Sequence, residues 1–118
     1  VNLTFSTDAD YYIPGMTRGE LVIDFIKTWQ AAGIPDAKIL EIMTINGYKC
    51  AETYDQRGPI RPGMAADMIA VPGNPLEDID ALRDVQFVMK DGMVFKRDGV
   101  VTPEVFFNAG PVNGWRIR

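Results

Sequence analysis

Residues 58–71 read GPIRPGMAADMIAV and separate two parts of the chain that differ in character. The prolines and glycines in the first half of this stretch are typical of turns. The second half, residues 67–71, is mostly apolar and predicts a short strand. The chain before this stretch is largely helical in its patterning, whereas the chain after it alternates short apolar runs with turn residues.

Two helices are predicted upstream. Thr17 and Glu20 have the spacing of a capping box, so the first helix is expected to begin there and to end near Gly33. Its buried face would consist of Leu21, Val22, Phe25, Ile26 and Trp29. The second helix is expected to begin at Pro35, whose missing N–H is not needed in the first turn. Its buried face would consist of Ile39, Leu40, Met43 and Gly47, and the glycine would allow close helix packing.

Short strands are predicted at residues 2–6, around Ile60, and at residues 67–71, 85–90 and 93–97. Asp91 and Gly92 join the last two and are typical of a type I′ hairpin, in which both central residues need a positive φ. Residues 76–82 predict one or two helical turns. Cys50, the one cysteine, falls in the helical pattern and is expected to be buried.

The composition is ordinary for a soluble protein of 118 residues, with 47% hydrophobic residues and a net charge of −4. The negative charge disfavours nucleic acid as a partner, because it repels phosphate. No apolar run approaches the roughly 20 residues that span a bilayer, and residues 1–5 do not resemble a signal peptide. Because residue 1 is Val1 rather than methionine, we expect the chain to begin inside a longer protein or after processing. The compartment is not indicated.

The sequence contains no histidine. Histidine is the commonest protein ligand of catalytic zinc and the commonest general base near neutral pH. A complete zinc hydrolase or a Ser-His-Asp hydrolase is therefore excluded within these residues.

Several motifs resemble those near the end of amidohydrolase-superfamily chains. Residues 58–71 resemble the pattern G-x-I-x-x-G-x-x-A-D followed by two aliphatic residues. Residues 74–79, NPLEDI, resemble an element of the imidazolonepropionase- and prolidase-like branch, and residues 85–94 are similar to the glycine-containing ending that follows it. Residues 6–9, STDA, and 43–47, MTING, resemble the end of the eighth barrel strand and the helix after it.

This resemblance implies an α/β fold, in which a (β/α)₈ barrel stands beside a small β-sandwich. Residues 1–54 would be the last barrel strand and its two helices, and residues 55–99 the C-terminal part of the sandwich. Residues 100–118 would form a C-terminal tail. The barrel is incomplete, because a whole one needs about 250 residues.

The resemblance also implies a site. Asp8 would end the last barrel strand, bind a metal together with ligands from the missing N-terminal part, and accept a proton from water. Asp10, Tyr11 and Tyr12 would lie on the loop that rims the site, as a solvated acid and packed aromatic rings or, alternatively, as contacts to substrate. Arg18 could bind a substrate carboxylate or face solvent. Asp67 is expected to organise a turn and strand rather than the metal site.

The implied parent is a metal-dependent hydrolase of C–N bonds in amides, cyclic amides or Xaa-Pro-like dipeptides, with zinc or another divalent metal as cofactor. The segment alone is expected to be inactive and to hold no metal stably. Two alternatives remain open: a non-catalytic α/β module that self-associates, and one chain of a split hydrolase. In either case we expect exposed barrel and sheet edges to bind a second copy or the missing N-terminal portion.

Overall fold

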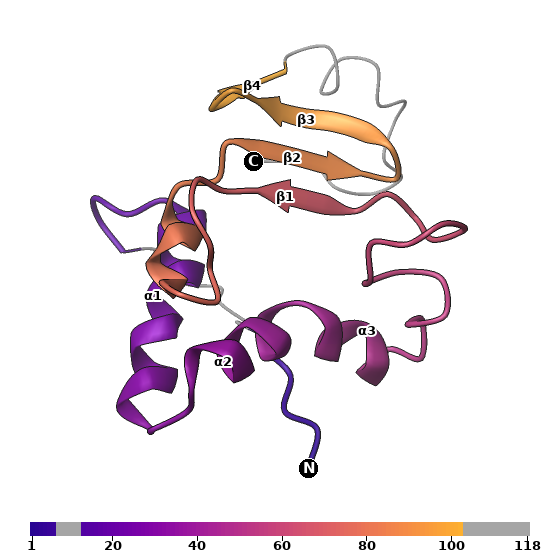
Figure 1. Ribbon diagram of the computed structural model, residues 1–118. Coiled ribbons are helices and arrows are strands. Elements are labelled where there is room, and N and C mark those ends of the chain that lie inside the picture. The colour runs from indigo at the N-terminus through magenta and orange to yellow at the C-terminus, as the bar shows by residue number, and fades with distance from the viewer. Residues whose placement is uncertain (7–12, 103–118) are drawn as a thin grey trace.

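The computed structural model describes residues 1–6 and 13–102. A helical layer comes first in the chain and an antiparallel sheet second (Figure 1). The helices are α1 (Arg18–Ala31), α2 (Asp36–Met43) and α3 (Ile45–Cys50). The strands are β1 (Met68–Ala70), β2 (Phe87–Lys90), β3 (Met93–Arg97) and β4 (Val100–Val101), and the 3₁₀ helix η1 (Ile79–Arg83) lies between β1 and β2.

Both predicted ends of α1 are confirmed. The Oγ1 atom of Thr17 accepts a hydrogen bond from the N–H of Glu20 at 3.2 Å, and the Glu20 carboxylate accepts one from the N–H of Thr17 at 2.7 Å. This reciprocal pair satisfies two amides that the first turn leaves without helical partners. At the other end Gly33 has a φ of +77° and donates to the carbonyl of Gln30, so its lack of a Cβ lets the chain turn out of the helix.

The second predicted helix is divided in two at Thr44. Pro35 lies at the N-cap of α2, one residue before its first turn. Thr44 has φ −122° and ψ −93°, and its hydroxyl donates to the carbonyl of Leu40 at 2.6 Å. A hydroxyl that bonds to the preceding turn in this way bends a helix. Gly47 does not serve close packing, because a Cβ there would meet no described atom within 4 Å.

The sheet is a simple meander in the order β1-β2-β3-β4, with every neighbouring pair antiparallel. The predicted turn between β2 and β3 is confirmed, since Asp91 and Gly92 have φ values of +50° and +77°. Asp98 and Gly99 repeat this conformation between β3 and β4. The sequence carried the same Asp-Gly signal at this second turn, but the hairpin was not predicted.

The main core lies where η1 packs against α1 and α2. Ile26, Ile39, Ile79 and Leu82 form one buried cluster. Ile26 and Ile39 belong to the two predicted helical faces, whereas Ile79 and Leu82 come from the segment predicted as one or two helical turns. The remaining residues of the predicted α1 face are only partly buried. Of the described helices, none is long and apolar enough to cross a membrane.

Three sequence predictions are wrong. Residues 2–6 form no strand, because no described strand pairs with them and an isolated strand leaves its backbone groups unsatisfied. No strand forms around Ile60 either, and its side chain is 78% exposed. Cys50 is exposed because it is the last residue of α3, where the helix meets the loop.

The core cluster predicts a contrast between two identical substitutions. Ile39→Ala should lower the free energy of unfolding by about 2–5 kcal/mol, because it leaves a cavity among buried side chains. Ile60→Ala should change it by no more than about 0.5 kcal/mol, because Ile60 faces solvent. Urea unfolding followed by circular dichroism measures both, and equal losses would show that the core lies elsewhere.

Candidate functional site

The residues predicted to carry the chemistry divide into two groups. Asp8, Asp10, Tyr11 and Tyr12 lie outside the described residues, and their roles stay predictions. Arg18 is the first residue of α1 and is exposed. The structure therefore places one of the five, and its position on a helix surface agrees with either of the two roles considered for it.

Among the described residues, the carboxylate of Asp67, which directly precedes β1, accepts hydrogen bonds from four other residues. One oxygen, Oδ1, accepts the backbone N–H of Asp91 at 2.8 Å. The other, Oδ2, accepts from Lys90 Nζ and Arg57 Nη1, both at 2.7 Å, and from the Tyr48 hydroxyl at 3.4 Å. We call these five residues the Asp67 cluster. Arg57 closes the cluster by a second ion pair, 2.6 Å from the Asp91 carboxylate.

The Asp67 cluster joins segments that are far apart in the sequence. Tyr48 comes from α3, Arg57 from the loop after it, and Lys90 and Asp91 from the end of β2 and the turn that follows. A backbone hydrogen bond from Gly92 to the carbonyl of Ala66 reinforces the same junction. The carboxylate therefore holds the β2–β3 turn against the start of β1, as predicted for Asp67, and also reaches the helical layer.

The charges in this cluster favour an ionised Asp67. Hydrogen bonds from Lys90 and from the Asp91 backbone hold the pKa of Asp67 far below its ordinary value. The neighbouring carboxylates of Asp91 and Asp67 in turn raise the pKa of Arg57. Only 9% of the Asp67 side chain is exposed, so these donors replace most of its hydration.

A divalent metal does not fit the donors that the structure describes. Among residues 1–6 and 13–102, no group of three or more acidic or cysteine side chains is placed to hold a metal ion. The oxygens of Asp67 are already occupied by N–H donors, and Lys90 and Arg57 would repel a cation there.

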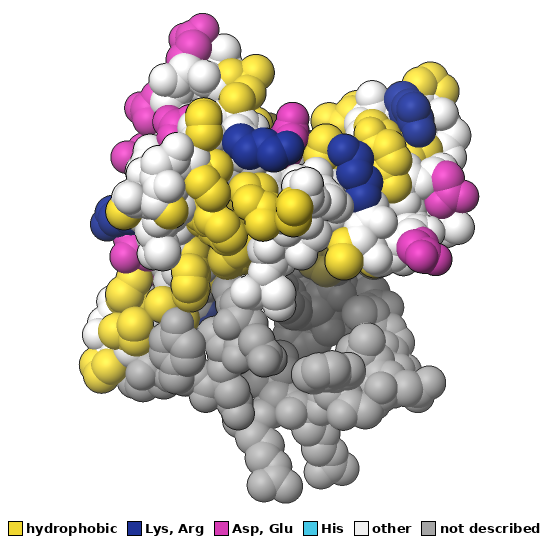
Figure 2. All heavy atoms as spheres, turned by 90° about the horizontal axis from the view of Figure 1, so that it is seen from below, with side chains coloured by type: hydrophobic (Ala, Val, Ile, Leu, Met, Phe, Trp, Pro, Cys, Tyr) yellow, Lys and Arg dark blue, Asp and Glu magenta, His cyan; other side chains and the backbone are white. Residues whose placement is uncertain are grey.

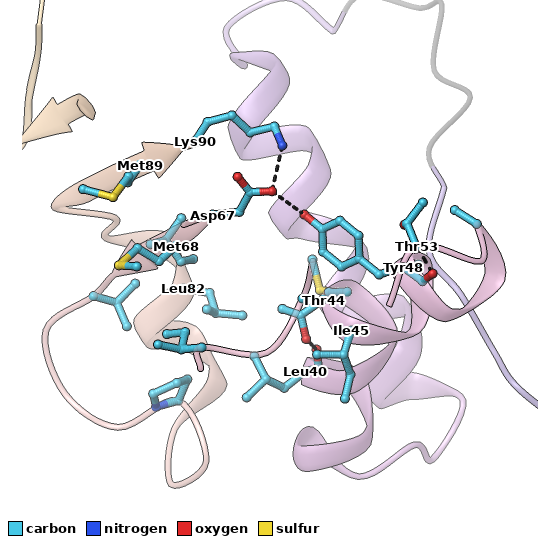
Figure 3. Close-up of a pocket in the computed structure, with 18 residues that line it drawn as sticks. Leu40, Thr44, Ile45, Tyr48, Thr53, Asp67, Met68, Leu82, Met89 and Lys90 are labelled. Carbon is cyan, nitrogen blue, oxygen red and sulfur yellow. Dashed lines mark hydrogen bonds and ion pairs between the residues drawn. The ribbon is translucent and has the colours of Figure 1, made fainter. Parts of the chain in front are cut away.

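A cavity of about 880 Å³ lies between α2 and α3 on one side and β1 and β2 on the other (Figure 3). Its lining is mainly apolar and includes Leu40, Met43, Ile45, Met68, Leu82 and Met89. Asp67, Lys90 and Tyr48 form a polar edge of this cavity, where the dashed lines in Figure 3 meet. Figure 2 views the molecule from below relative to Figure 1, and apolar side chains, coloured yellow, gather on that face.

A second polar residue was not singled out from the sequence. Asn46 on α3 is 1% exposed, and its Nδ2 donates to the carbonyl of Leu3 at 2.9 Å. The signal was its spacing: Ile39, Ile42 and Asn46 follow one another at helical intervals on a buried face. A polar side chain on such a face requires a hydrogen-bond partner.

Comparison with protein families matches residues 1–95 to one described as "Amidohydrolase family". A crystal structure of an Xaa-Pro dipeptidase with methionine bound in its active site is 33% identical, with a TM-score of 0.66 over 79% of this chain and 22% of that one. A crystal structure of an amidohydrolase is 31% identical, with a TM-score of 0.59 over 64% of this chain and 19% of that one. A putative prolidase from Bifidobacterium longum, 24% identical with a TM-score of 0.61 over 70% of this chain and 21% of that one, shares the fold. No curated protein matches.

These likenesses place the chain among α/β proteins related to hydrolases. The chain belongs to the amidohydrolase family, since the match covers residues 1–95. The resemblance drawn from the sequence motifs is thereby confirmed. The chain spans 22% of the length of the Xaa-Pro dipeptidase structure and 19% of that of the amidohydrolase structure.

The Asp67 cluster predicts a pH dependence of stability. Because the pKa of Asp67 is lowered by folding, its stabilising contribution is present above the unfolded pKa of about 3.9. It is lost as the pH falls below that value toward the lowered folded pKa. Asp67→Asn should therefore lower the urea midpoint at pH 7 and make the midpoint less sensitive to pH between about 4 and 2.

The matched control is Asp55→Asn, which removes a carboxylate from the exposed part of the same loop. It should leave the midpoint at pH 7 nearly unchanged. A wild-type midpoint and pH slope in Asp67→Asn would show that the cluster does not stabilise the fold.

Proposed function

We propose that this chain is the C-terminal part of a metal-dependent amidohydrolase that hydrolyses a C–N bond in an amide, a cyclic amide or an Xaa-Pro-like dipeptide. The observation that carries the proposal is the continuous family match over residues 1–95, which includes Asp8. The 33% identity to an Xaa-Pro dipeptidase favours dipeptides among these substrates.

In this proposal residues 1–54 are the last strand of a (β/α)₈ barrel and its helices, and residues 2–6, which form no strand in this structure, would pair only with a barrel strand from another part of the protein. Residues 55–99 would belong to a small β-sandwich. Within the described part of the chain, the order of elements supports a division after the helices, because α1, α2 and α3 precede residue 51 and β1 to β4 follow residue 67. The remaining strands would belong to another part of the protein, since a barrel requires about 250 residues. Residues 100–118 would follow as the C-terminal segment, but Val100 and Val101 at its start pair with β3 as strand β4 and so belong to the sheet.

Asp8 is proposed to accept the proton of the attacking water. A carboxylate is a suitable proton acceptor, and barrel enzymes place such groups at the C-terminal ends of their strands. Asp10, Tyr11 and Tyr12 are proposed to line the rim, and Arg18 to bind a substrate carboxylate through its planar guanidinium.

Zinc or another divalent metal would supply Lewis-acid polarisation of the carbonyl and a more acidic water. Its histidine ligands would come from outside this chain, which contains no histidine. We therefore propose that the chain alone is inactive. The same proposal holds if this chain is one chain of a split hydrolase, in which a separate N-terminal polypeptide supplies the histidine ligands.

A self-associating module is a second candidate, favoured by apolar side chains at the sheet edges. β1 and β4 are the edge strands of the described sheet. Ile69 on β1 is 49% exposed, and Val100 and Val101 on β4 are 69% and 50% exposed. Exposed apolar edge strands can pair with another chain. A homo-oligomer, or a complex with an N-terminal portion, would cover these edges.

The catalytic proposal predicts the effect of one substitution. In protein that includes the preceding part of the family fold, Asp8→Asn should lower kcat for hydrolysis of Xaa-Pro dipeptides at least about 100-fold, because it removes the proton acceptor. Asp55→Asn, which removes an exposed carboxylate, should leave kcat unchanged. Equal activity of Asp8→Asn and the unmodified protein would refute the role of Asp8.

The same assay on the 118-residue chain should show no turnover, and elemental analysis should show no stoichiometric zinc. Stoichiometric zinc with turnover that Asp8→Asn abolishes would show that the chain is a complete enzyme.

The edge strands predict self-association. Sedimentation velocity over a range of concentrations should show a dimer or larger species, because pairing covers the exposed edges. Val100→Lys should shift the distribution toward monomer, since a charged side chain opposes edge pairing. Ile60→Lys, in an exposed loop, is the matched control and should not. A monomer at every concentration would exclude this association.

A further inference from the structure

One buried polar side chain contributes to neither the core cluster nor the Asp67 cluster. Asn46 is 1% exposed and is the one buried polar or charged residue among those described. Burying a carboxamide is unfavourable unless its groups form hydrogen bonds. An aliphatic residue would suit a buried helical face better, so the presence of asparagine there requires a specific use of its amide.

The amide of Asn46 donates to the backbone of the first described segment. Its Nδ2 lies 2.9 Å from the carbonyl oxygen of Leu3, 43 residues earlier in the sequence. A backbone carbonyl can be recognised in this way whatever side chain it carries. The contact therefore fixes the position of the main chain at Leu3 relative to α3.

A second contact holds the same segment two residues later. The ring of Phe5 packs edge-to-face on Phe25 of α1, with centroids 5.4 Å apart and an interplanar angle of 62°. Residues 1–6 form no strand, so contacts with α3 and α1, rather than pairing with a neighbouring strand, hold this segment in place. One contact from α3 and one from α1 together restrict both the position and the direction of the segment.

We infer that Asn46 is a positioning residue whose buried amide, with the Phe5–Phe25 contact, fixes the backbone segment that leads into Asp8. This inference rests on the proposed role of Asp8, which follows Ser6 by two residues. Displacement of a catalytic group by about 1 Å can cost a large part of the rate. A rigid approach to Asp8 therefore has a functional use that a flexible chain end would lack.

The test is backbone ¹⁵N relaxation of the 118-residue chain. In the unmodified protein the ¹H–¹⁵N NOE values of residues 3–6 should approach those of α1. In Asn46→Leu, which keeps the shape but removes the donor, they should fall to values typical of a free chain end. Ile42→Val weakens the same helical layer without touching this hydrogen bond, and it should leave residues 3–6 restrained.

Asn46→Asp separates positioning from a general loss of packing. Its ionised carboxylate would repel the Leu3 carbonyl, whereas the protonated form can donate to it. Burial raises the pKa of such a carboxyl group. Acidification should therefore restore the NOE values of residues 3–6 in Asn46→Asp but not in Asn46→Leu. If packing alone held the segment, residues 3–6 would stay restrained in the uncharged Asn46→Leu at every pH.

A measurement on the unmodified chain covers the case in which both variants fail to fold. The side-chain amide protons of Asn46 should exchange with solvent at least 10-fold more slowly than those of Asn74, which is exposed. Equal exchange rates, or restrained residues 3–6 in Asn46→Leu, would overturn the inference. Both measurements are made without substrate, so they can fail while hydrolysis is confirmed, or succeed while it is refuted.

Discussion

The described fold depends most on the carboxylate of Asp67. It accepts hydrogen bonds from the Asp91 backbone, Lys90, Arg57 and Tyr48, and so holds the β2–β3 turn, the start of β1 and α3 together. On the opposite side of the cavity, η1 joins the two layers through apolar contacts with α1 and α2. One junction is electrostatic and the other hydrophobic. The space between them remains open as the cavity.

Elements set by local chemistry could be predicted from the sequence. The capping box of Thr17 and Glu20 and the turn at Asp91 and Gly92 involve residues within three positions of one another, and both were confirmed. The break at Thr44 was missed because it depends on a single side chain that competes for a backbone carbonyl. The strand predicted at residues 2–6 failed because strand formation needs a distant partner, which the pattern alone does not reveal.

The candidate site could be predicted even less completely, because its contacts join residues that are far apart in the sequence. Asp67 was predicted to organise a turn, but its partners Tyr48 and Lys90 lie 19 and 23 residues away and could not be paired from spacing. Asn46 was detectable only as a polar residue on an apolar face. Asp8 came from family resemblance, and the family match over residues 1–95 includes its position. The described residues thus provide scaffold and positioning, and the proposed chemistry depends on Asp8 together with groups from outside the chain.

Asp67 acts as an ionised structural anchor and not as a metal ligand. Site-specific ¹³C NMR titration of its carboxyl carbon in the folded chain tests this most directly. The carboxyl carbon should titrate with a midpoint far below the ordinary value of about 3.8, and its chemical shift should not change on addition of Zn²⁺. A midpoint near 3.8, or a stoichiometric shift with Zn²⁺, would contradict it.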